Sequence, residues 1–425
     1  MSKADYLLSI ESVRPRCKIV FEKALVNQLT NFDVDLSKLD GLVDYTIKTI
    51  QDDFGTAYDK IPPHGRWQHF EAGGVPRIDQ LVGLWPDSDK KEVTTRLIDL
   101  FLVSVLLDAG AGKHWKYVEK GSGQVINRSE GLATACYHMF KDGLFSSLPD
   151  QDPYRVDGKA LVNLNEDAFK AGMQVSDSNP LEGFNGRLAL LNRLGKALQE
   201  NKQLFGPDAR PGYLVDYLLS HEKTIGRTVP LTTLWDALMK GLGPIWPQEG
   251  RTKLDGVVLG DTWPCSSMPH IVSDPSQSLV PFHKLTQWLC YSLLTPIKKY
   301  LDLEFVGESL QTGLPEYRNG GLLVDMGVLT LKPSAIASAS SSSDKSASSV
   351  PVFPVESDVI VEWRAVTVGF LDLILDKVNA KLGSQLSLPQ LLEAGTWKAG
   401  RRIAAELRPV TNGPPIDIIS DGTVF

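Results

Sequence analysis

Residues 281–329 form the most informative segment of the sequence, PFHKLTQWLCYSLLTPIKKYLDLEFVGESLQTGLPEYRNGGLLVDMGVL. Proline favours the first turn of a helix, so Pro281 predicts a helix that starts there and carries His283 and Lys284. The later run LPEYRNGG brings Glu316 to a predicted tight turn, because its two glycines permit positive φ and close approach of a ligand. This concentration of ionisable and aromatic side chains indicates a functional site.

The segments around this one have the apolar spacing of helices. Examples are KEVTTRLIDLFLVSVLLDAGAG, NPLEGFNGRLALLNRLGKALQEN and ESDVIVEWRAVTVGFLDLILDKVNAKL. Each repeats apolar residues every three to four positions, which is typical of an amphipathic or buried helix. The short run GVVLG predicts a strand. The sequence therefore predicts a mainly α fold with a few short strands.

The length of 425 residues and a hydrophobic content of 42% support a substantial core. We expect one elaborated domain over residues 1–425, with two helical lobes, about 1–225 and 226–425, as the other possibility. Serine and alanine dominate residues 333–354. Such a composition offers little to a core and predicts a mobile insertion.

The composition also narrows the class of protein. A net charge of −7 argues against a surface that tracks nucleic-acid phosphates. The N-terminus carries charges instead of a secretory apolar segment, and the most apolar window is too short to span a bilayer. The four cysteines lie far apart, so free thiols are expected. We expect a soluble cytoplasmic protein without nucleic-acid or membrane partners, and the sequence leaves its oligomeric state open.

Two carboxylates stand beside an arginine and an aromatic residue, Glu316 in PEYR and Glu362 in VEWR. Two acids can divide a hydrolysis, one stabilising a cation or activating water and the other protonating a leaving group. Lys284 is suited to orient a substrate oxygen or a catalytic carboxylate. The alternative is that both acids only form ion pairs, with Arg318 or Arg364.

Other side chains suggest weaker hypotheses. The loop IPPHGRWQHFEAGGVPR, flanked by prolines and glycines, is predicted to reach a pocket. Asp261, Cys265, His270 and His283 are the only loose set of zinc ligands, although their spacing matches no familiar metal motif. A capped loop is the alternative account, and His283 is equally suited to a structural role. No Walker loop, GxGxxG after a strand or GxSxG elbow occurs in the sequence.

The combination of RSEGLATACYHMF, NPLEGFNGRLALLNRLG, GDTWP, PFHKLTQWLCYSL, LPEYRNGG and VEWRAVTV resembles the uracil-catabolism protein four family, also described as a uracil-regulated gene product. The resemblance covers nearly the whole chain except the serine-rich insertion. It implies a place in a pathway that converts uracil, through its ribonucleotide, to ring-opened products and urea.

A more distant resemblance suggests a type of reaction. PFHKLTQWLCYSL with LPEYRNGG is similar to the lysine-bearing helix and acidic turn of queuosine-nucleotide N-glycosylases, and VEWRAVTVGFLD resembles their later glutamate and arginine helix. This implies a fold related to the helix-hairpin-helix DNA glycosylases. Lys284, Glu316, Glu362 and Arg364 are the matching positions. This chain has glutamate at 316 where that family has aspartate, which shifts the carboxylate by about one methylene.

Together these observations predict an N-ribosyl hydrolase that cleaves ribosylurea or its phosphate to urea and ribose or its phosphate. Glu316 would stabilise the cation or position water, Glu362 or His283 would protonate the leaving group, and Lys284 would orient Glu316 or bind a ribosyl oxygen. No cofactor is required, and zinc is an alternative. The predicted substrate-binding residues are Arg318, Arg364, Trp288, His283, Arg128 and Asp325.

Three other functions stay open. A metal-dependent hydrolase would act on the ureido carbonyl through Asp261, Cys265 and His283. A noncatalytic protein would only bind a pathway intermediate or another enzyme. A nucleic-acid glycosylase is possible by fold analogy, although fold does not confer substrate and this chain is acidic.

Overall fold

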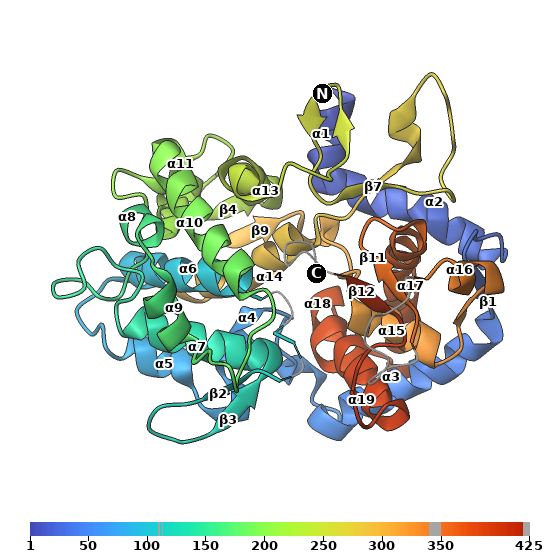
Figure 1. Cartoon of the computed structure of the whole chain (residues 1–425), viewed down its shortest axis with the longest axis horizontal. Coiled ribbons are helices and arrows are strands. Elements are labelled where there is room, and N and C mark those ends of the chain that lie inside the picture. Colours follow the sequence, from blue (N-terminus) through green and yellow to red (C-terminus); the bar gives the residue numbers. More distant parts are fainter. Residues whose placement is uncertain (109–110, 113, 340–349, 420–425) are drawn as a thin grey trace.

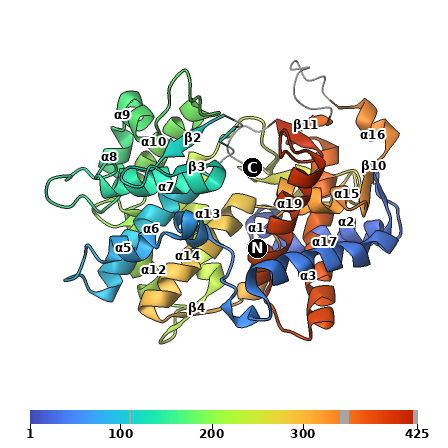
Figure 2. The same cartoon turned by 90° about the horizontal axis from the view of Figure 1, so that it is seen from below.

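The computed structural model describes residues 1–108, 111–112, 114–339 and 350–419. Helices dominate these residues, and they gather into two lobes that both Figure 1 and Figure 2 show side by side. We call them the α6 lobe and the α17 lobe after their central helices. The predicted mainly α fold is confirmed.

The α6 lobe surrounds α6, a helix buried along most of its length, which packs against α14. Its elements come from the middle of the chain, with α14 added from further on. They are α4 (Arg66–Phe70), α5 (Arg77–Val82), α6 (Lys90–Leu106), α7 (Arg128–Lys141), α8 (Gly158–Val162), α9 (Glu166–Gly172), α10 (Phe184–Glu200), α11 (Lys202–Phe205), α12 (Leu214–Ser220), α13 (Leu231–Leu242) and α14 (Lys284–Leu301).

The α17 lobe combines the two ends of the chain. Its long central helix packs against α2 and α3 from the N-terminus and against α15. Its elements are α2 (Val13–Leu25), α3 (Leu39–Phe54), α15 (Tyr317–Asp325), α16 (Pro333–Ala337), α17 (Asp358–Leu382), α18 (Leu388–Gln390), a π-helix (Leu391–Thr396) and α19 (Trp397–Leu407). Helix α1 (Lys3–Leu8) lies beside strand β8 (Leu279–Pro281), which pairs with β7 (Thr262–Pro264).

Each of the two lobes combines segments from both halves of the chain. One hydrophobic core draws mainly on residues 67–314, and the other joins residues 13–61 to residues 263–282 and 322–416. The physical reason is that α17 is apolar almost all round, so it needs partners on every side. Helices from both ends of the chain supply them.

The strands form six two-stranded sheets within the described residues. Each strand has only two or three residues, so the sheets serve as short connections between helical segments. The antiparallel pairs are β1 (Phe32–Val34) with β10 (Leu329–Leu331), β2 (Lys116–Val118) with β3 (Val125–Asn127), β5 (Lys253–Leu254) with β6 (Val257–Val258), and β7 (Thr262–Pro264) with β8 (Leu279–Pro281). The parallel pairs are β4 (Thr228–Pro230) with β9 (Glu304–Val306), and β11 (Val352–Pro354) with β12 (Asp417–Ile419).

Two local predictions were wrong. Pro281 ends strand β8, and α14 begins three residues later at Lys284, because pairing with β7 holds Pro281 extended. The LPEYRNGG run opens α15, so its glycines are helical instead of lying in a turn with positive φ. A side chain at Gly320 would lie 2.8 Å from the Trp363 ring. The glycine therefore allows α15 to pack closely on α17.

The serine-rich segment is also more ordered at its ends than predicted. It contains helix α16, and strand β11 pairs with β12 near the C-terminus. Phe353 is buried in this pairing, which explains why apolar residues flank the low-complexity stretch. Residues 340–349 lie outside the described residues.

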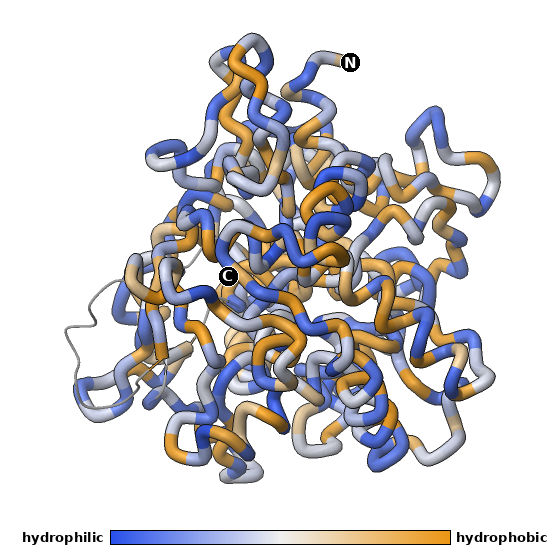
Figure 3. The backbone as a smooth tube through the Cα atoms, turned by 90° about the vertical axis from the view of Figure 1, so that its right-hand side faces the viewer, coloured by the Kyte–Doolittle hydropathy of each residue, from blue (hydrophilic) through white to orange (hydrophobic). Residues whose placement is uncertain are grey.

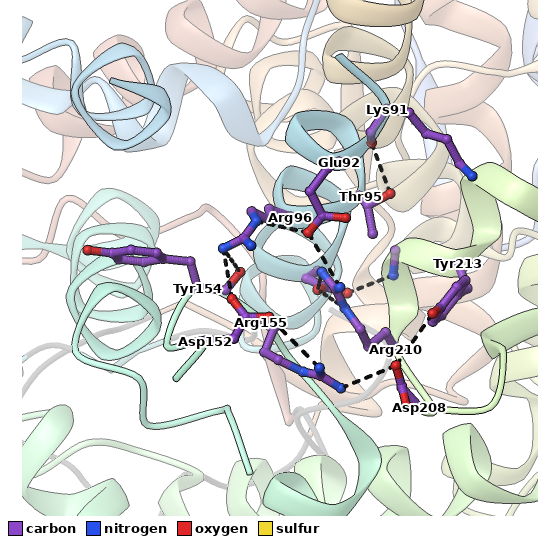
Figure 4. A network of polar contacts seen from close by, with 12 residues as sticks. Lys91, Glu92, Thr95, Arg96, Asp152, Tyr154, Arg155, Asp208, Arg210 and Tyr213 are labelled. Atoms are coloured by element: carbon purple, nitrogen blue, oxygen red, sulfur yellow. Dashed lines mark hydrogen bonds and ion pairs between the residues drawn. The ribbon is translucent and has the colours of Figure 1, made fainter. Parts of the chain in front are cut away.

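Buried ion pairs fix loops onto α6. Figure 4 shows Arg210 and Arg96 reaching carboxylates from neighbouring segments. Asp99, fully buried on α6, accepts from Arg210 Nη2 at 2.7 Å and from the Gly212 amide at 2.7 Å. Arg96 pairs with Asp152 at 2.9 Å. These contacts attach the segments around Asp152 and Arg210 to α6.

Hydrophobic and hydrophilic residues alternate along the chain in Figure 3. Among the residues that the structure describes, no helix is long and apolar enough to cross a membrane. The four cysteines are free and buried, as expected from their spacing.

Candidate functional site

The β7–β8 hairpin sets the position of Lys284, the first residue of α14. The main-chain oxygen of Asp261 accepts from the Phe282 amide at 2.9 Å, and its Oδ2 accepts from the Lys284 amide at 3.0 Å. A carboxylate is favourable at a helix N-terminus. His283 precedes the helix with φ of 45°, and its Nε2 lies 2.8 Å from the Leu7 carbonyl oxygen. These contacts fix where the lysine side chain leaves the helix.

The Lys284 side chain is half-buried and has no direct partner. Its Nζ makes no hydrogen bond or ion pair with any residue that the structure describes. Burial lowers the pKa of Lys284, while the charges of Glu316 and Asp108 oppose that shift. An ammonium group without a partner, close to two carboxylates, is available to a ligand.

Glu316 is the N-cap of α15. Its Oε2 accepts from the Arg318 amide at 2.8 Å and its Oε1 from the Asn319 amide at 2.5 Å. Burial raises the pKa of Glu316, while these two amides and the charge of Lys284 oppose that shift. Capping alone would account for a serine or aspartate at this position. The influence of the Lys284 charge on its pKa also places the buried Glu316 carboxylate near that unpaired ammonium.

Arg364 joins the two elements that carry Lys284 and Glu316. Its Nη1 and Nη2 bind both oxygens of Asp261 at 2.7 and 2.8 Å, and its Nε donates to the Pro315 carbonyl oxygen at 3.4 Å. The guanidinium also lies 4.0 Å from the centre of the Phe282 ring. Although burial opposes it, the pairing with Arg364 holds the pKa of Asp261 below its usual range. Arg364 thus links the segment that carries Lys284 to the segment that carries Glu316.

Glu362 does not lie beside Lys284 and Glu316. It is fully buried and accepts from the Thr30 and Asn31 amides, each at 2.7 Å, and from the Ser267 hydroxyl. Two residues along a helix correspond to a rotation of about 200°, so Glu362 and Arg364 lie on opposite sides of α17. The structure therefore does not bring Glu362 together with Glu316. Its bonds tie α17 to the N-terminal segment.

Four rings lie one helical turn beyond Lys284. Trp288 shares its face of α14, since residues four apart lie above one another. The Trp288 ring centre is 4.7 Å from that of His64 and 5.7 Å from that of His69. Trp397 lies 5.9 and 5.7 Å from the same two histidines. This ring cluster joins α4, α14 and α19, and so joins the two lobes.

Comparison with known proteins identifies the family. A family model described as "Protein of unknown function (DUF1688)" matches residues 6–425. The chain belongs to this family. It is 48% identical over 434 residues to "Uracil catabolism protein 4" of Lachancea kluyveri, covering 99% of this chain and 98% of that protein. It is 46% identical over 425 residues to "Protein urg3" of Schizosaccharomyces pombe, with the same coverage of 99% and 98%.

Three arginines of this DUF1688 chain meet where α7, α15 and α19 come together. A side chain at Gly400 would collide with the Arg318 backbone, so α15 and α19 touch there. Arg401 pairs with Glu130 at 2.5 Å, in the first turn of α7. Burial lowers the pKa of Arg128, and the charges of Arg318 and Arg401 lower it further. Arg128 has no hydrogen bond or ion pair with the described residues. The group is suited to an anion.

The remaining predicted residues have structural partners. Asp325 binds Arg408 through both oxygens, at 2.8 and 2.5 Å. It ends α15, about 13 Å along the axis from Glu316. His283 is held by Leu7, as described above, and burial lowers its pKa. The structure brings together Lys284, Glu316, Trp288, Arg318 and Arg128. Arg364 supports this group through its contacts with Asp261 and Pro315.

The proposed zinc ligands do not converge on one point where they could share a metal ion. Asp261 is paired with Arg364, Cys265 is buried in the hydrophobic core of the α17 lobe, and His270 is exposed. Within residues 1–108, 111–112, 114–339 and 350–419, no group of three or more histidine, cysteine or acidic side chains is arranged to hold a metal. These residues therefore do not fit zinc.

Sequence reasoning missed several residues near Lys284. They are His64, Asp108, Glu130, Glu393, Trp397 and Arg401. The first three come from separate parts of the chain, whereas the last three recur every four residues, a helical spacing that could have signalled a shared face. Glu393 lies on the π-helix, a rare element often found at functional sites, and its Oε2 is 2.6 Å from His64 Nδ1. The loop predicted to reach a pocket does carry His69 into the ring cluster.

One surface hollow lies away from these residues. It has a volume of about 450 Å³ and is lined by the last turns of α17 and the loop after it, from Asp376 to Gln385. Twelve residues of helix, about 18 Å, separate Arg364 from Asp376. The hollow holds no arrangement of groups for catalysis, so we place the candidate site at Lys284 and Glu316.

Proposed function

We propose that this chain is an N-ribosyl hydrolase of uracil catabolism, which cleaves ribosylurea or its phosphate to urea and ribose or its phosphate. The observation that carries the proposal is the unpartnered Lys284 ammonium beside the buried Glu316 carboxylate. The name of the relative from L. kluyveri supports the pathway. The proposal includes a relationship of this helical fold to helix-hairpin-helix glycosylases.

The reaction breaks the bond between the anomeric carbon and the ureido nitrogen. Positive charge develops on the ribosyl ring, and a carboxylate in a site shielded from water stabilises it. Glu316 is buried and held by two amides, so it is already oriented for this role. Water then adds to the anomeric carbon, and urea leaves after its nitrogen gains a proton.

The two groups can also exchange the protons that the reaction needs. Burial raises the pKa of Glu316 and lowers that of Lys284, so it brings the two values closer together. Proton transfer between groups of similar pKa is efficient. In this scheme Lys284 protonates the departing nitrogen and Glu316 takes a proton from the attacking water. Because the two side chains are not hydrogen-bonded to each other, a second water molecule carries that proton to Lys284 and restores the ammonium. Neither Glu362 nor His283 is required.

We expect a bell-shaped pH profile whose two limbs are displaced toward each other. Activity needs ionised Glu316 and protonated Lys284, so the limbs of kcat/KM should lie above pH 4.5 and below pH 10.5, the ordinary pKa values of these groups. Lys284→Met should remove the alkaline limb and move the acidic limb upward, because the lysine charge favours ionised Glu316. A profile with limbs outside these values would contradict the assignment.

The arginine group predicts a preference for the phosphorylated substrate. Arg128 and Arg318 lack carboxylate partners among the described residues, and Arg318 is buried. Arginine binds phosphate with charge-assisted hydrogen bonds. Arg128→Met should raise KM for ribosylurea phosphate by about tenfold, equivalent to ~1.4 kcal/mol, and leave KM for ribosylurea unchanged. Equal effects on both substrates would show that Arg128 does not contact phosphate.

The direct test is to incubate the purified protein with synthetic ribosylurea and with its phosphate and to measure released urea. We expect urea from at least one of them. If neither yields urea while the protein gives a cooperative unfolding transition, the proposal is wrong. Binding of ribosylurea phosphate without turnover would favour the noncatalytic function instead.

A further inference from the structure

Two buried donors in the ring cluster have no acceptor. His69 Nε2 and Trp288 Nε1 are both enclosed by protein and make no hydrogen bond within the described part of the chain. Their side chains belong to residues that are only 6% and 4% exposed. Buried polar groups are nearly always paired in folded proteins, so two orphans in contacting rings require an explanation. The most direct explanation is a ligand oxygen that accepts a hydrogen bond from both nitrogens.

Arg66 determines which nitrogen of His69 carries the proton. Its Nη1 lies 3.0 Å from His69 Nδ1, and a guanidinium can only donate. Nδ1 is therefore the acceptor, and in the neutral ring the hydrogen is on Nε2. Arg66 is itself held by Ser104, through Nε at 2.8 Å, and by Asp108 at 2.8 Å. The Nε2–H donor of His69 is thus built into the fold.

His69 is kept neutral. Burial lowers its pKa, and the Arg66 charge lowers it further. The carboxylates that face it act in the opposite direction without reversing the shift. They are Asp108, Glu130 and Glu393. The Trp288 indole never ionises. Both donors therefore carry no charge, which suits a neutral oxygen acceptor better than a phosphate or a carboxylate.

His69 and Trp288 lie close to Lys284, one of the proposed reacting groups. Trp288 lies one turn after Lys284 on the same face of α14, so its ring lies beside the lysine. The His64 ring centre lies 4.7 Å from that of Trp288, and the Trp397 ring centre lies 5.7 Å from that of His69. A group that reaches this place from the lysine must be small and flat to lie among the rings.

We propose that His69 and Trp288 form a donor pair that binds the carbonyl oxygen of the departing ureido group. This assignment rests on the N-ribosyl hydrolase function proposed above. When the bond to the anomeric carbon breaks, its electron pair goes to the ureido nitrogen and is shared with the oxygen. The two N–H donors stabilise that charge until the nitrogen takes the proton of Lys284 and neutral urea leaves.

Substitutions test the pair in turnover. Trp288→Phe and His69→Phe should each lower kcat for ribosylurea phosphate by about 10²-fold, with a smaller change in KM. His69→Gln keeps a donor at similar reach and should recover part of the loss. Trp85→Phe is the matched control, because Trp85 is also buried in the α6 lobe with an unpaired Nε1. It should leave kcat unchanged. Unchanged kcat in both phenylalanine variants would overturn the proposal.

A binding experiment separates this inference from the proposed reaction. The indole N–H signal of Trp288 in ¹⁵N-labelled protein is assigned by its loss in Trp288→Phe. N-methylurea should shift that signal, whereas N-methylguanidine, which has the same shape but no acceptor oxygen, should not. This result stands even if no urea is released from ribosylurea. No shift with methylurea, or equal shifts with both compounds, would contradict the donor pair.

Discussion

Replacing Glu316 by glutamine should lower the rate of urea release by about 10²- to 10⁴-fold. The amide has the shape of the carboxylate but carries no charge for the ribosyl cation and takes no proton from water. The fold should survive, because the glutamine oxygen can still accept one of the two amide bonds at the start of α15. Thermal unfolding of the variant should therefore resemble that of the unaltered protein.

Glu316→Ser separates catalysis from helix capping. Serine is a good N-cap, so this variant should retain most of the stability of α15, within about 1 kcal/mol. It should nevertheless be as inactive as Glu316→Gln. If Glu316→Ser keeps the activity, capping is the whole role of residue 316 and the carboxylate does not take part in the reaction.

Breaking the pair between Asp261 and Arg364 should have the largest effect on stability. Arg364→Met leaves the Asp261 carboxylate buried without its main partner, and such a loss costs about 3–5 kcal/mol. The effect should extend to the site, because Asp261 binds the Lys284 amide and Arg364 contacts the Pro315 carbonyl next to Glu316. Guanidinium chloride unfolding measures this change directly.

The double variant Asp261→Leu with Arg364→Met is the control for that pair. Replacing both members by apolar groups removes the uncompensated charge, so the double variant should be more stable than Arg364→Met alone. If Arg364→Met changes the free energy of unfolding by less than about 0.5 kcal/mol, the pair does not hold α17 against the β7–β8 hairpin.

The sequence allowed the helices to be predicted, while the assignment of Lys284 and Glu316 to a site stays a prediction. Apolar spacing located α14 and α17 because both are long and bury regular faces. Lys284 and Glu316 do lie close together. The start of α14 was misplaced, because pairing of β8 with β7 overrides the preference of Pro281 for a helix. Such pairing involves a distant segment and has no signal in the local sequence.

Spacing within one segment could not predict which segments meet at the ring cluster. His64 and Glu393 meet across more than three hundred residues of chain. The surroundings of Glu362 also depend on a distant segment. Its proximity to Arg364 in sequence suggested a shared site, but helical rotation turns it toward Thr30 and Asn31. Only the packing of the N-terminal segment on α17 determines which of the two faces the site.

The most direct test of the central claim is to identify the bond that is cleaved. Ribosylurea and its phosphate can be labelled with ¹³C at the ureido carbonyl and followed by NMR during incubation with the protein. Cleavage of the N-ribosyl bond predicts that the label appears in urea, at a rate that Glu316→Gln suppresses. Label in carbamate or bicarbonate would show attack at the ureido carbonyl, and would contradict the assignment of Lys284 and Glu316 to ribosyl transfer to water.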